Sequence, residues 1–99
     1  MKMIQESIEQ VKMALYDAKN YAEKYINYKA NGNEKYAQNF YEMAQDEIKH
    51  SKYLFEVLQD EVEKIERVYR PTETMEKEWH EAQKYYKDEK ELIEQILLA

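Results

Sequence analysis

Glu47 and His50 are the residues whose types and spacing could do chemistry. They are three positions apart, and side chains at this spacing on an α-helix project from the same side, one turn apart. Helical bundles that bind metal ions present carboxylate and imidazole ligands in this way. Carboxylates and imidazoles together suit iron and manganese. The pair therefore predicts a transition-metal site on a long helix.

The surroundings of Glu47 suggest that it is buried. The expected helix has an apolar stripe into which Glu47 falls, formed by Phe40, Ala44, Leu54, Leu58, Val62 and Ile65. A carboxylate in such a stripe is costly unless it is paired, hydrogen-bonded or bound to a metal. Because glutamate is common in the chain, the spacing to His50 can also arise by chance. A buried Glu47 bonded to a tyrosine or lysine of another helix therefore stays open as an alternative.

The elements that must position this pair are helices. The chain has 99 residues with one glycine, one proline and 36% charged residues. Apolar residues at helical spacing in such a composition predict an all-α protein with few turns. We expect one helical domain over residues 1–99, an antiparallel three-helix protein. Its helices are predicted at about 2–30, 34–69 and 72–98.

Local signals place the two breaks between helices. Gly32 can adopt the left-handed conformation that ends a helix, and Pro71 cannot continue one. Asn33 and Thr72 are then expected to cap the second and third helices. Connections this short make consecutive helices antiparallel neighbours.

Composition excludes several classes of function. The net charge of −6, with basic residues interleaved among glutamates, argues against a nucleic-acid partner. The chain has no cysteine, so disulfides, zinc–thiolate sites and thiol catalysis are excluded. No apolar run reaches membrane-spanning length, and the first residues are unlike a signal peptide. We therefore expect a cytoplasmic protein without a membrane partner.

The segment from about Tyr16 to Leu58 resembles the first helical hairpin of the ferritin-like superfamily, and rubrerythrins most closely in pattern. The shared pattern is an Ala/Tyr-rich helix, a Gly turn, and then Phe, Ala and Glu-x-x-His in register. In that superfamily each hairpin supplies one carboxylate from its first helix and a Glu-x-x-His from its second. Two such hairpins form a four-helix bundle around a di-iron site. The resemblance implies that Glu47 is a bridging ligand and His50 a terminal one.

Two departures from the family pattern shape this expectation. The family's first-helix glutamate falls on Ala14, which cannot bind a metal, and Asp17 is the nearest substitute, one turn further along. The chain also has one such hairpin instead of two. A two-fold dimer would supply the second hairpin and complete the bundle. This arrangement is similar to that of the encapsulated ferritins, and we expect a homodimer or a higher homo-oligomer.

Two functions are therefore expected. The first is a small ferritin-like protein that binds iron, with manganese or zinc as substitutes, at a site formed by Glu47, His50 and Asp17 and shared between subunits. The resemblance implies Fe(II) oxidation at a di-iron centre. The alternative is a non-enzymatic helical oligomer with a degenerate site, which Ala14 favours.

Of the remaining candidates, His80 is expected to be exposed. Four tyrosines are placed near the level of Glu47: Tyr21, Tyr25, Tyr28 and Tyr53.

Overall fold

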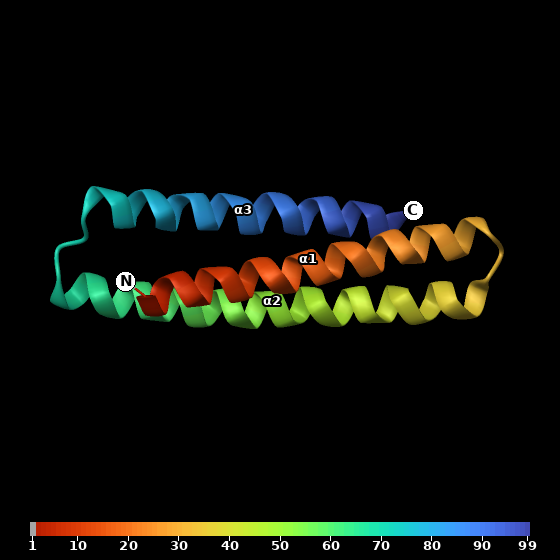
Figure 1. Cartoon of the computed structure of the whole chain (residues 1–99), viewed down its shortest axis with the longest axis horizontal. Helices are drawn as coiled ribbons and strands as arrows, with labels where there is room; N and C mark the ends of the chain where they lie inside the picture. Colours follow the sequence, from red (N-terminus) through yellow and green to blue (C-terminus); the bar gives the residue numbers. More distant parts are fainter. Residues whose placement is uncertain (1) are drawn as a thin grey trace.

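Three helices make up almost all of the computed structural model, which describes residues 2–99. They are α1 (Lys2–Ala30), α2 (Glu34–Val68) and α3 (Glu73–Leu98). No strand occurs within residues 2–99, so the predicted all-α class is confirmed. The predicted helix ends lie within one residue of these bounds. The helices run antiparallel in sequence order and form a rod with extents of 55 × 17 × 17 Å (Figure 1).

Both helix breaks have the local chemistry that the sequence predicts. Gly32 has a φ of +77°, in the left-handed region. The side chain of Asn33 accepts a hydrogen bond of 3.1 Å from the backbone N–H of Tyr36, which caps α2. Thr72 caps α3 in the same way, because its hydroxyl accepts a hydrogen bond of 3.2 Å from the N–H of Met75. The two predicted caps are therefore confirmed.

Small side chains bring α1 and α2 close together. The two helices are in contact along most of their length. Five alanines of these two helices are buried: Ala14, Ala18, Ala22, Ala37 and Ala44. Larger residues fill the remaining space, with Leu15 and Leu58 almost completely buried. Hydrophobic burial along this hairpin therefore forms the main core.

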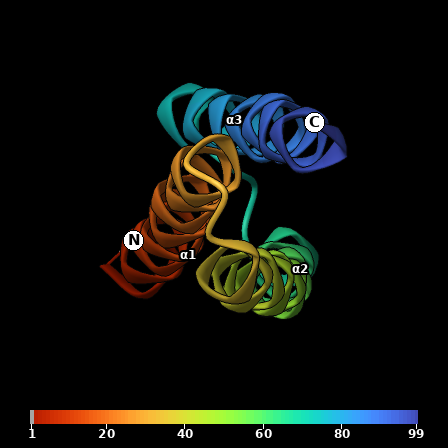
Figure 2. The same ribbon diagram turned by 90° about the vertical axis from the view of Figure 1, so that its right-hand side faces the viewer.

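The third helix packs mainly on α1. Seen end-on, α1 has α2 and α3 on different sides, and α2 and α3 meet at few points (Figure 2). Their contact includes an aromatic stack: the ring of Phe55 stacks on Tyr86 with centroids 4.2 Å apart and on Trp79 with centroids 5.7 Å apart. Ala82, Ile93 and Leu97 are the buried residues of α3. The Glu47 side of α2 is therefore positioned by α1.

Candidate metal centre

Glu47 lies at the edge of the buried face of α2, and its expected burial is wrong. Its side chain is 27% exposed. The buried residues at this level are Ile48 and Ser51, at 8% and 0% exposure. One residue along a helix is a rotation of about 100°. The core face of α2 is thus turned toward Ile48, which leaves Glu47 half-buried.

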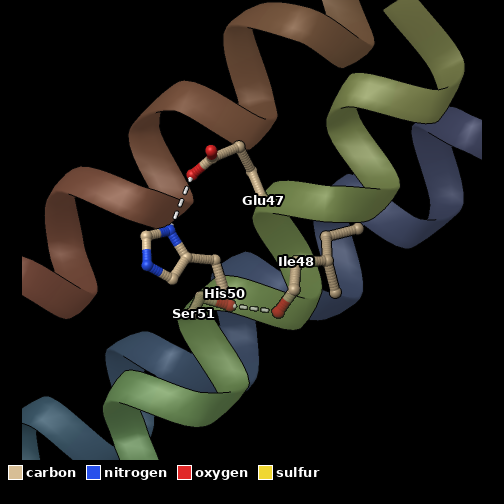
Figure 3. Close-up of polar contacts among 4 residues, drawn as sticks. All are labelled: Glu47, Ile48, His50 and Ser51. Carbon is tan, nitrogen blue, oxygen red and sulfur yellow. Dashed lines mark hydrogen bonds and ion pairs between the residues drawn. The ribbon is translucent and has the colours of Figure 1, made fainter.

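Ser51 explains part of this difference. It occupies a core position of α2, but serine is polar and therefore does not extend the apolar pattern of the sequence. Its Oγ donates a hydrogen bond of 2.7 Å to the backbone carbonyl of Ile48 (Figure 3). A serine bonded to its own helix in this way presents a small, satisfied side chain to the core. No buried side-chain oxygen or nitrogen within residues 2–99 is left without a hydrogen-bond partner.

Glu47 and His50 lie close together, as their spacing predicts. Glu47 Oε2 is 3.7 Å from His50 Nδ1, and the His50 side chain is 59% exposed. Figure 3 shows both side chains on one side of α2, with the side chain of Ile48 on the other. Two ligand atoms that each lie about 2.1 Å from one ion are about 3.0–3.4 Å apart. A small side-chain adjustment would therefore allow this pair to share one ion.

The pair lines an open groove between α1 and α2, with a volume of about 320 Å³. Asp17 lines the same groove from α1, and Ala14, which is 4% exposed, is part of its wall. The structure thus places all three predicted ligands around one groove. Within residues 2–99, however, no group of three histidine, aspartate or glutamate side chains is arranged to hold an ion. One chain brings together a pair of donors and places a third nearby.

The groove is also lined by residues that were not predicted from the sequence. Gln10 and Met13 line it from α1 and Leu54 lines it from α2. Met13 is 65% exposed, so an apolar side chain lies at the open rim of the groove. Their place beside Asp17 could have been predicted, because residues 10, 13 and 17 are spaced three and four apart and therefore share one face of α1.

The other candidates do not contribute to this groove. His80 is exposed, as predicted. Tyr21 and Tyr28 contact the ring of Phe40, with centroids 6.1 and 5.5 Å away. Tyr25 instead contacts Tyr41, with ring centroids 5.2 Å apart, and Tyr53 is 64% exposed. None of the four tyrosines lines the Glu47 groove.

Comparisons of the chain with protein-family models, with curated proteins and with solved structures found no match. None of the helices within residues 2–99 is both long and apolar enough to cross a membrane.

Proposed function

We propose that this chain binds a divalent transition metal, iron or manganese, with Glu47 and His50 as ligands. The observation that carries the proposal is their 3.7 Å separation at the rim of an open groove. A partly exposed carboxylate beside an exposed imidazole can exchange water for an ion without unfolding. The chemistry of this donor set fits both metals.

A second copy of the chain would complete the coordination. Metal ions in carboxylate–histidine sites take four or more ligands, whereas one chain offers two in contact and Asp17 nearby. The groove is open, so a second copy can approach it. A two-fold dimer would double the Glu47–His50 pair and place the two hairpins in a four-helix bundle of ferritin-like form. This dimer is part of the proposal.

The proposed chemistry is that of bound iron, which supplies one-electron transfer toward dioxygen or peroxide. The residues of this chain would hold and orient the ion: Glu47 through its carboxylate, His50 through Nδ1, and Asp17 from the facing wall of the groove. Handling or oxidation of Fe(II) is the activity that this ligand set supports.

A second candidate function is a helical oligomer without catalysis. The specific observation in its favour is Ala14, which is buried in the groove wall at the position where the ferritin-like pattern has a carboxylate. In that case the contact between Glu47 and His50 at the surface contributes little to stability.

Metal binding separates the two candidates. Purified wild-type protein should contain Fe or Mn when its metals are measured together, and it should bind Fe(II) and Mn(II) in an anaerobic titration. A double variant with Glu47→Ala and His50→Ala should lose this binding and keep its helical circular-dichroism spectrum. The matched control changes Glu76 and His80 to alanine, because both are exposed on α3. It should bind like the wild type.

The role of Asp17 needs its own variant. Asp17→Ala should weaken Mn(II) binding at least tenfold if this side chain supplies a ligand, and it should leave helicity unchanged. Wild-type protein that takes up no Fe, Mn or Zn would overturn the metal proposal and leave the structural oligomer.

A further inference from the structure

Helix α2 carries a second stripe of side chains that is separate from its buried face. Its members alternate four and three residues apart, which is the heptad spacing of helices that pack on another helix. We call this stripe the α2 seam: Tyr36, Phe40, Met43, Glu47, His50, Leu54, Val57 and Glu61. None of the eight is buried; each is half-buried or exposed. The monomer therefore leaves a regular helix-packing surface partly uncovered.

The seam does not face α3. The groove between α2 and the C-terminal end of α3 is lined by other residues of α2, Tyr41 and Ile48 among them. The α2 ring that stacks on α3 belongs to Phe55, which is also outside the seam. The seam instead runs beside α1. Its ends already contact α1, because Tyr36 and Phe40 pack on the ring of Tyr28 and Glu61 accepts a hydrogen bond from Ser7. At its middle, Glu47, His50 and Leu54 line the open groove.

We propose that a second copy of this chain packs on the α2 seam, with the two α2 helices antiparallel and Glu47 facing the partner's His50. The alternation of four and three is symmetric about the midpoint between Glu47 and His50. Every seam residue therefore faces a seam residue in this register, as an isologous two-fold contact requires. Met43 faces the partner's Leu54, and Phe40 faces the partner's Val57.

The residue types that face one another favour this register. They also favour a second copy of this chain as the partner that packs on the seam. Apolar residues face apolar residues, and the Glu47 carboxylate faces an imidazole. The outermost seam residue, Tyr36, faces the partner's Glu61, so that its phenol hydroxyl can donate to the second carboxylate oxygen, since Ser7 Oγ of the same chain already donates to Glu61 Oε2. Matching of this kind is needed because two chains that each carry a net charge of −6 repel one another.

Other alignments lose this matching. Sliding the partner by one heptad places Met43 against the partner's Glu47 in one direction and against the partner's Glu61 in the other. A parallel pairing sets each residue against its own copy, so that Glu47 meets the partner's Glu47. Each of these alternatives buries a carboxylate against an apolar side chain or a like charge, which is unfavourable.

This pairing extends the proposed function to a defined dimer. Only the shared metal site in this dimer rests on the proposed function. Two Glu47 and two His50 side chains would meet about the two-fold axis, in two adjacent layers about 4.5 Å apart along the helices, and provide four ligands. The packing of the seam itself does not require a metal.

Cysteine crosslinking tests the register, because the chain has no cysteine of its own. In a variant with both Met43→Cys and Leu54→Cys, the two thiols lie about 16 Å apart along one helix, at about 1.5 Å per residue. They cannot form a disulfide within one chain, since bridged Cα atoms are less than about 7 Å apart. Oxidation with diamide in the presence of EDTA should convert most of this variant to a covalent dimer.

Two matched controls report the alternatives. A variant with Tyr36→Cys and Leu54→Cys would crosslink in a register shifted by one heptad, and Met43→Cys alone would crosslink in a parallel pair. Neither should form a covalent dimer under the same conditions. The proposal is overturned if either control crosslinks as readily as the first variant, or if the first variant stays monomeric while its helical spectrum is intact.

A lysine substitution gives a second test without crosslinking. Met43 and Leu92 are similarly exposed, at 40% and 42%, but Leu92 lies on α3. Light scattering at tens of micromolar should find a dimer for the wild type and for Leu92→Lys, and a monomer for Met43→Lys. A monomeric wild type, or a dimer that Met43→Lys leaves intact, would contradict the proposal. If the wild type forms this dimer but binds no metal, the shared metal site is contradicted and the packing of the seam is not.

Discussion

Ser7 and Glu61 form a hydrogen bond between α1 and α2, in which Ser7 Oγ donates to Glu61 Oε2 over 2.7 Å. The two residues are 54 positions apart in the sequence. Ser7 is buried, at 8% exposure, and Glu61 is half-buried. Hydrogen bonds to an ionised acceptor are stronger than those between neutral groups. This bond therefore fixes the start of α1 against the second half of α2.

Replacing Ser7 with alanine should destabilise the protein, because it leaves the Glu61 carboxylate half-buried without this donor. The expected loss in the free energy of unfolding is about 1.5–3 kcal/mol. Urea denaturation of Ser7→Ala, Glu61→Ala and the double variant would give the coupling energy. Single variants whose losses simply add would show that the two side chains do not interact.

Leu58 should be among the most costly core positions. It is one of the largest fully buried side chains, at 0% exposure. Leu58→Ala removes buried apolar surface and leaves a cavity, so we expect a loss of about 3–5 kcal/mol in the free energy of unfolding. Leu98→Ala is the control, since Leu98 is 86% exposed and its truncation should change stability by less than about 0.5 kcal/mol. Similar values for the two variants would contradict the assigned core.

Gly32 should resist substitution for a purely conformational reason. A Cβ added there meets no atom within 4 Å, so space is available, but the φ of +77° is strained for other residues. Gly32→Ala should cost about 1 kcal/mol of stability, and Gly32→Asn should cost less because asparagine tolerates this conformation. Thermal unfolding of both variants measures the difference. An alanine variant as stable as the wild type would show that the turn adopts another conformation.

Tyr85 should make the fold sensitive to alkaline pH. Burial raises the pKa of Tyr85 above its ordinary value of 10.0, and the nearby Glu89 and Glu9 carboxylates raise it further. The unfolded chain then loses this proton at a lower pH than the folded chain. Stability should therefore fall as the pH rises from about 10 through the folded pKa.

Tyr85→Phe should remove this part of the alkaline loss. Comparing its free energy of unfolding with that of the wild type below and above pH 10 measures the effect. Tyr53→Phe is the control, because Tyr53 is 64% exposed. Equal alkaline slopes for the wild type and Tyr85→Phe would argue against the raised pKa.

The helix ends were predictable because their determinants are local. Gly32, Asn33 and Thr72 each act through the backbone within a few residues, so the sequence around each break is sufficient. The contact between Glu47 and His50 was predictable for the same reason, since it follows from their spacing on one helix.

The burial of Glu47 was not predictable in this way, because α2 carries two stripes that the apolar pattern merges. The expected stripe combined seam residues such as Phe40 and Leu54 with core residues such as Leu58 and Val62. Which stripe turns inward depends on how α1 packs, and that is a tertiary effect. Ser51 also contributed, because its polar side chain lies on the core face with its hydroxyl bonded to the helix backbone, and the sequence pattern there is less apolar as a result.

The limited contact between α2 and α3 has a consequence for how the molecule opens. Because α3 is held mainly by α1, it can detach while the α1–α2 hairpin keeps its long interface. Partial openings of this kind require less free energy than global unfolding. Backbone amides of α3 should therefore exchange with deuterium sooner than those near Leu15 and Leu58, and the hairpin should remain as the slowly exchanging unit.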